Sequence, residues 1–232
     1  VTSGIWRPVK LVFYDDARID DYYVRQQAIS EQEARLENQL EVTNVTDKEQ
    51  QAVVRIDYSY KGVEKTLEQT VSLAPGKNRI CLPLVIDQPH LWTPNGWAEP
   101  ALYDFTASVT VNGREVASQK EQIGLRSTRV VKEKDKDGES FYFEVNGKPL
   151  FAKGSNMIPN DALLPNVTAE RYARLMEDVQ RSNMNLIRVW GGGIYEDDKF
   201  YEEADRHGIL VWQDFLFACT TYPHDPTFLK RV

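Results

Sequence analysis

The chain has 232 residues, 41% of them hydrophobic and 27% charged, and its formal net charge is −7. This is the composition of a globular protein with room for one large domain or two ordinary ones. The negative charge argues against a surface that holds nucleic-acid phosphates, and no apolar run approaches the about 18 residues of a membrane helix, so we expect neither nucleic acid nor a membrane as a partner.

The first half of the chain is predicted to form short antiparallel strands. Apolar and polar residues alternate between residues 34 and 42 and again between residues 54 and 60, which is the pattern of half-buried strands. Asn112-Gly113 is typical of a two-residue hairpin turn. About seven short strands over some 100 residues indicate an immunoglobulin-like β-sandwich. We place it at residues 20–130, after a segment at residues 1–19 that reads as the end of an earlier domain.

A loop rich in Pro, Gly and Trp interrupts this pattern at residues 89–100. One interpretation is a rigid connection whose Trp rings pack on the sandwich. The other is that the rings of Trp92 and Trp97 stack on a ligand, since sugar sites use such side chains. The sequence leaves both open.

Beyond a charged linker near residues 129–140, strands alternate with helices. Thr168 is a candidate N-cap, and apolar residues at helical spacing predict a helix that ends near Ser182. Its buried stripe is predicted to consist of Tyr172, Leu175, Met176 and Val179. Apolar runs at residues 186–190 and 209–215 flank a second helical stretch at residues 197–206, which together read as a βαβ unit.

This alternation implies a parallel sheet covered by helices. The predicted fold class is therefore multidomain, β plus α/β, with the N-terminal part of a (β/α)8 TIM barrel at residues 131–232. A full barrel needs about 250 residues, so the part after the linker holds only about two or three of the eight units. We expect the chain to be a piece of a longer protein, cut at both ends.

Candidate site residues stand at the ends of the predicted parallel strands. They are Asn156, Arg188, Trp190 and Asp214. In parallel α/β barrels, the side chains that perform chemistry lie at the C-terminal ends of strands. Each also has a structural interpretation, as a turn residue, an ion pair or a packing residue. Three glycines after Trp190 let the backbone turn tightly and approach a ligand closely, and Trp212 is expected in the core.

The motifs, taken in order, resemble glycoside hydrolase family 2, and within it the β-mannosidase branch. The resemblance rests on Gly4–Val9, Trp92–Gly96 with Leu102-Tyr103, Gly124–Arg126, Phe143–Asn156, Arg188–Glu196 and Trp212–Phe215. It implies that residues 1–19 end a sugar-binding sandwich. Galactosidase and glucuronidase relatives tend to carry a Ser-His pair where this chain has Trp190-Gly191.

The resemblance implies an exo-acting retaining hydrolase that removes terminal β-D-mannose from oligosaccharides or glycosides. Such enzymes use two carboxyl groups, which the family supplies as Glu residues from later strands, the acid/base after an Asn. No Asn-Glu dipeptide occurs here. We therefore expect no catalytic residue in this chain, and expect the isolated chain to be inactive.

The same resemblance gives the candidate residues their roles. Arg188 would keep the nucleophile ionised, Trp190 would line the mannosyl pocket, Asp214 would bind a sugar hydroxyl or orient Arg188, and Asn156 would assist. No cofactor is implied. The two cysteines form no disulfide framework, and the three histidines show no metal-ligand spacing.

Two alternatives remain open. One is a family 2 hydrolase of the β-galactosidase or β-glucuronidase type, and the other is a non-catalytic scaffold or carbohydrate-binding module. The resemblance suggests a periplasmic or secreted protein in a bacterium and a lysosomal one in an animal.

Overall fold

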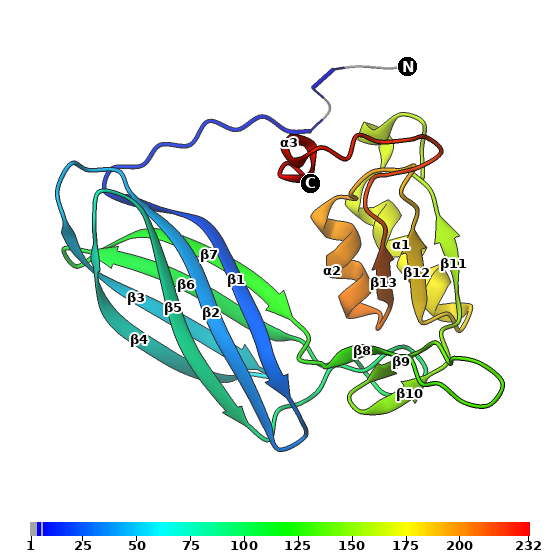
Figure 1. Cartoon of the computed structure of the whole chain (residues 1–232). Helices are drawn as coiled ribbons and strands as arrows, with labels where there is room; N and C mark the ends of the chain where they lie inside the picture. The colour runs from blue at the N-terminus through cyan, green and yellow to red at the C-terminus, as the bar shows by residue number, and fades with distance from the viewer. Residues whose placement is uncertain (1–3, 6) are drawn as a thin grey trace. The chain divides into compact units, whose positions relative to one another are not determined.

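A computed structural model describes residues 4, 5 and 7–232 (Figure 1). Residues 1–3 and Trp6 lie outside the described residues, so the motif Gly4–Val9 is covered only in part. The chain divides into two compact units. One runs from Pro8 to Phe151, and the other consists of Ala152–Val232 with the described residues before Pro8.

Two antiparallel sheets make up most of the first unit. One has the strand order β1-β2-β5, with β1 at Ala17–Ile29, β2 at Glu33–Asn44 and β5 at Gly76–Asp87. The other has the order β4-β3-β6-β7, with β3 at Gln50–Tyr60, β4 at Val63–Leu73, β6 at Tyr103–Val111 and β7 at Arg114–Ile123. The predicted β-sandwich is confirmed.

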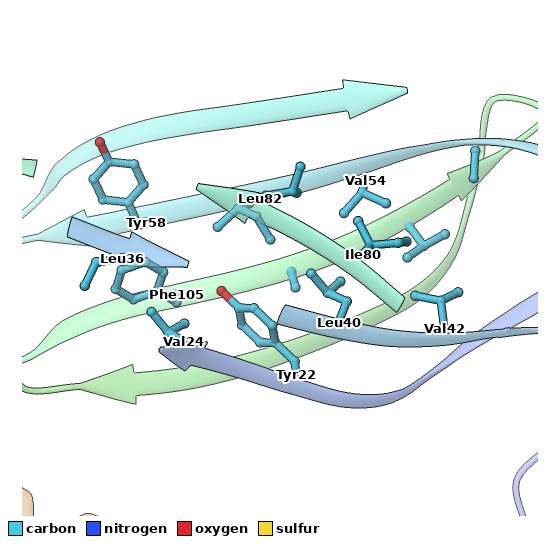
Figure 2. Packing of buried hydrophobic residues seen from close by; sticks show 14 of the residues in the cluster. Tyr22, Val24, Leu36, Leu40, Val42, Val54, Tyr58, Ile80, Leu82 and Phe105 are labelled. Atoms are coloured by element: carbon cyan, nitrogen blue, oxygen red, sulfur yellow. The ribbon is translucent and has the colours of Figure 1, made fainter. Parts of the chain in front are cut away.

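Side chains from both sheets fill the space between them (Figure 2). In β2, every second residue from Ala34 to Asn44 is buried, as the period of two predicts. Two residues of this row, Asn38 and Asn44, are polar. Asn38 accepts a hydrogen bond from the Tyr22 hydroxyl at 2.8 Å and donates one to the Leu82 carbonyl at 3.2 Å. These partners let an amide lie in an apolar core.

The predicted hairpin turn joins β6 to β7. Asn112 and Gly113 have φ values of 51° and 77°. Both lie in the left-handed region that this kind of two-residue turn requires, and Asn and Gly adopt it at the lowest cost.

Trp92 packs inside the sandwich unit and is 0% exposed. Its backbone N–H donates to the Leu125 carbonyl at 2.9 Å, and the Arg126 guanidinium carbon lies 4.4 Å from the centre of its ring. A Cβ added at Gly124 would come within 2.5 Å of the ring. The structural interpretation of this Trp is therefore confirmed, because a ligand cannot reach it. Trp97 of the same loop is 39% exposed.

A small antiparallel sheet of order β10-β9-β8 completes the unit. It consists of β8 at Thr128–Val131, β9 at Tyr142–Val145 and β10 at Lys148–Leu150. The turn at Asn146-Gly147, which joins β9 to β10, has φ values of 50° and 72°. The Arg129 guanidinium on β8 donates two hydrogen bonds, of 2.6 and 2.8 Å, to the Glu144 carboxylate on β9.

The second unit has a parallel sheet of order β11-β12-β13. The strands are β11 at Gly154–Met157, β12 at Leu186–Val189 and β13 at Leu210–Gln213. The helices are α1 at Ala169–Arg181, α2 at Asp198–Arg206, α3 at Pro226–Leu229 and the 3-10 turn η1 at Leu164–Asn166. The Thr168 side chain caps α1 by accepting from the Arg171 N–H, as predicted.

Helices α1 and α2 pack on the sheet through one apolar cluster. Buried residues of this cluster are Met157, Tyr172, Met176, Val179, Ile187, Val189, Phe200, Ala204 and Ile209. The alternate positions of β12, Leu186 and Arg188, are only half-buried. The helices therefore cover the face of Ile187 and Val189.

The expectation of a barrel portion at residues 131–232 needs correction. The described residues contain no barrel. Their three parallel strands form an open sheet in which β11 and β13 each have one neighbour, whereas a closed parallel barrel takes eight. Trp212 on β13 is 42% exposed and not in the core, because it lies beside Arg188 on the sheet face that the helices do not cover. Across residues 4, 5 and 7–232, no helix is long and apolar enough to cross a membrane.

Replacing Gly124 with Ala tests the packing around Trp92. The new methyl would meet three atoms of a side chain that has no room to retreat, so we expect the free energy of unfolding to fall by about 1–3 kcal/mol. Urea denaturation of the chain measures this. Lys65→Ala on the exposed strand β4 is the control, and it should stay within about 0.5 kcal/mol. Equal midpoints for the two variants would contradict the packing argument.

Candidate functional site at the ends of the parallel strands

Three of the four predicted site residues meet where the parallel strands end. Arg188 of β12 lies opposite Asn156 of β11, and Asp214 directly follows β13. The Arg188 Nε and Nη2 atoms donate to the two carboxylate oxygens of Asp214 at 3.1 and 2.6 Å. The Nη1 atom donates to the Asn156 Oδ1 atom at 3.3 Å. Each strand thus contributes one member of a hydrogen-bonded row.

Asp214 is a carboxylate fixed in its ionised form. The hydrogen bond from Arg188 holds its pKa below the usual value, with a smaller contribution from the Gly191 N–H, while desolvation opposes both. The Gly191 N–H donates to Asp214 Oδ2 at 3.1 Å. The two Asp214 oxygens therefore orient Arg188, which is one of the two roles that the sequence left open. The Arg188 side chain is 37% exposed and the Asp214 side chain 19%, so the pair remains accessible to a ligand.

Trp190 stands on the same side of its strand as Arg188. Ile187 and Val189 are buried, whereas Arg188 and Trp190 are half-buried, as expected for alternate positions. The backbone N–H and the backbone carbonyl of Trp190 are both hydrogen-bonded. Its N–H donates to the Met157 carbonyl at 3.1 Å, and its carbonyl accepts from the Gly193 N–H at 3.0 Å.

The first two glycines after Trp190 pack closely against other atoms of the chain. A Cβ added at Gly191 would lie 2.5 Å from the Phe215 carbonyl oxygen and 2.6 Å from that of Phe217. A Cβ added at Gly192 would lie 2.0 Å from an atom of the Trp190 ring. Neither glycine is among the residues with positive φ. The close approach that the sequence predicted is thus made to the chain's own atoms.

Sequence reasoning gave Glu196 no role, and the structure buries it at 5% exposure. Its Oε2 atom accepts a hydrogen bond from the Tyr172 hydroxyl at 2.5 Å, and within the described residues its Oε1 atom has no hydrogen-bond partner. Burial raises its pKa, although the Tyr172 hydrogen bond acts in the opposite direction. Glu196 therefore anchors the end of the β12–α2 loop to α1. Only its position after the glycine motif could have drawn attention to it.

The comparison with protein families concerns the sandwich unit. The family model described as Glycosyl hydrolases family 2 matches residues 17–126, which run from the first residue of β1 to the last residue of the Gly124–Arg126 motif. Residues 17–126 of this chain are thus similar to this family.

Individual proteins resemble all or most of the chain. It is 37% identical over 232 residues to β-mannosidase B of Aspergillus flavus. That alignment covers 100% of this chain and 27% of the Aspergillus protein. The crystal structure of the β-D-mannosidase from Dictyoglomus thermophilum is 39% identical with a TM-score of 0.90, over 99% of this chain and 28% of that one. The exo-chitosanase of Amycolatopsis orientalis is 25% identical with a TM-score of 0.73, over 85% of this chain and 22% of that one. The chain thus spans about a quarter of the length of the curated relative.

Asp214→Asn tests the charge of the strand-end pair. Because the pKa of Asp214 is lowered in the folded chain, its ionised form stabilises the fold above the ordinary Asp pKa of about 3.9. That contribution disappears as the pH falls through the lowered pKa. We expect the variant to have the lower Tm from pH 7 to pH 5, with a gap that closes in more acidic solution. Thermal unfolding between pH 7 and pH 2 measures the gap, and a gap that persists unchanged would contradict the assignment.

Glu196→Gln tests the buried anchor, and its pH dependence has the opposite sign. The pKa of Glu196 is raised by burial, so the folded chain keeps a proton that the unfolded chain loses above about pH 4.3. The stability of the natural chain should therefore fall, relative to that of the variant, as the pH rises from there to the raised pKa. The Gln side chain of the variant can still accept the hydrogen bond from the Tyr172 hydroxyl, so any other effect of the substitution on stability should not vary with pH. A Tm difference between the two proteins that is constant from pH 4 to pH 8 would contradict a raised pKa of Glu196.

Proposed function

We propose that this chain is part of an exo-acting retaining β-mannosidase, an O-glycosyl hydrolase that removes terminal β-D-mannose from oligosaccharides or glycosides. The observation that carries the proposal is the fixed row of Asn156, Arg188 and Asp214 beside Trp190, at the strand ends where parallel α/β enzymes place their sites. Its support is the similarity of the whole chain to two proteins named as β-mannosidases.

In this proposal, the open parallel sheet of the second unit packs against further parts of the whole protein. The open edge of β13 and the exposed side chains of Trp212 and Phe215 would be covered by further strands and helices, since unpaired edges and large apolar side chains favour burial. The proposed domains are residues 1–19 as the end of a sugar-binding sandwich, 20–130 as the immunoglobulin-like sandwich, and 131–232 as the domain that contains the open parallel sheet.

The strand-end row would form one wall of the active site. A retaining glycosidase needs a nucleophile and an acid/base about 5–5.5 Å apart. Asp214 is already bound by Arg188 and Glu196 is buried, so we assign neither of these roles to them and place both catalytic Glu residues outside the chain.

Arg188 would act on the nucleophile by its charge. A guanidinium near a carboxyl group lowers the pKa of that group, which would keep the nucleophile ionised for attack on the sugar. Because Asp214 accepts from Nε and Nη2, the guanidinium is fixed before substrate binds. Trp190 would offer its ring to the apolar face of the mannosyl ring, and Asn156 would complete the row.

The test is the sugar preference of the whole protein. We expect the kcat/KM for 4-nitrophenyl β-mannoside to exceed that for the β-galactoside, the β-glucuronide and the β-glucosaminide, because the site wall is of the mannosidase type. The isolated 232-residue chain should not turn over any of them, since it lacks the carboxyl pair. A preference for another sugar would reject the mannosidase assignment, and turnover by the isolated chain would reject the placement of the catalytic residues.

A further inference from the structure

We propose that Gly192 is a positioning residue that sets the place of the Trp190 ring and so helps determine which sugar the site accepts. This inference rests on the proposed function, because it assumes that Trp190 lines the sugar pocket. In this proposal, Gly192 does not itself contact the sugar. It acts by leaving a space that the indole ring occupies.

The contact is specific to the outer part of the indole. A Cβ built on Gly192 would lie 2.0 Å from Cη2, 2.2 Å from Cζ3 and 2.5 Å from Cζ2 of Trp190. These three atoms belong to the six-membered ring, and they are the nearest atoms to the added Cβ. The ring of Trp190 therefore lies directly against the face of Gly192 where any other residue carries its side chain.

The backbone of Trp190 is held in place, so the ring can change position only by rotation of its own side chain. Its N–H is bound to the Met157 carbonyl of β11 at 3.1 Å, and its carbonyl is bound to the Gly193 N–H at 3.0 Å. The Gly191 N–H is held by Asp214 at 3.1 Å. The turn is held at three points, and the ring lies where only the absence of a side chain at Gly192 leaves room for it.

The neighbouring glycine has a different reason to be glycine. A Cβ at Gly191 would meet the carbonyl oxygens of Phe215 and Phe217 at 2.5 and 2.6 Å, and backbone cannot move aside cheaply. At Gly192 the obstacle is the far end of a side chain that can rotate away. Gly192 is also exposed and its φ is outside the left-handed region, so Ala is compatible with its backbone.

Gly192→Ala should therefore displace the Trp190 ring while the fold remains intact. Trp190 and Arg188 occupy alternate positions of one half-buried strand face, so a displaced ring changes the shape of the proposed pocket beside the guanidinium. Misplacement of a positioning group by about 1 Å can lower the rate roughly a hundredfold.

A double-mutant cycle in the whole protein tests the inference. The variants are G192A, W190A and G192A/W190A, and the readouts are kcat/KM on 4-nitrophenyl β-mannoside and Tm. We expect G192A to lower kcat/KM roughly tenfold to a hundredfold with a Tm close to that of the parent. In the W190A background, the same change should have no further effect, because the ring on which it acts is gone. G191A is the matched control and should lower Tm markedly.

The outcomes separate the two proposals. If W190A lowers kcat/KM but G192A does not, the positioning role is overturned and the proposed function stands. If G192A lowers kcat/KM by the same factor with and without the Trp190 ring, Gly192 does not act through Trp190 and the inference is overturned. Loss of the folding transition in G192A overturns it as well, since the methyl would then strain the backbone. If W190A leaves kcat/KM unchanged, the role of Trp190 in the proposed function fails, and this inference fails with it.

Discussion

Two hydrogen bonds of 3.1 and 2.6 Å join the Arg188 guanidinium to the Asp214 carboxylate, and the geometry of the strand-end row depends on this pair. It links the end of β12 to the end of β13. Because Asp214 also accepts from the Gly191 N–H, the pair fixes the start of the glycine loop, and through the remaining guanidinium nitrogen it reaches Asn156. A planar guanidinium held by a carboxylate fork loses little conformational freedom when a ligand binds.

The β12–α2 loop is held at its two ends by carboxyl groups in opposite electrostatic situations. Asp214 is partly exposed, faces a guanidinium and has a lowered pKa. Glu196 is buried beside a hydroxyl, and burial raises its pKa. The first therefore contributes charge to the site, whereas the second fastens the loop to α1. A positively charged partner lowers a carboxyl pKa and burial raises it, so the two acidic residues near this loop have pKa shifts of opposite sign.

Each unit contains a glycine packed against a Trp ring, but the consequences differ. In the sandwich, Gly124 faces Trp92, whose ring is fully buried under the Arg126 guanidinium. That contact locks the Trp92 loop to the Gly124–Arg126 motif and contributes to stability. In the other unit, Gly192 faces a ring that is only half-buried. A ring that can still move transmits a change at Gly192 to the site and not to the core. The same sequence signal, a glycine near a tryptophan motif, thus marks a packing contact in one place and a positioning contact in the other.

The sequence by itself determined the strand alternation of the sandwich, the Asn112-Gly113 turn, the capped helix after Thr168 and the strand-end position of the site residues, because these follow from periodicity and from local backbone preferences. Only the tertiary structure decided what depends on contacts between distant residues: that Trp92 is buried, that Trp212 lies exposed on an edge strand, and that Glu196 is an anchor. The predicted barrel portion shows the same limit. Local patterns predicted strands and helices correctly, but the closure of a barrel depends on how many strands pair with one another, and the described residues provide an open sheet of three.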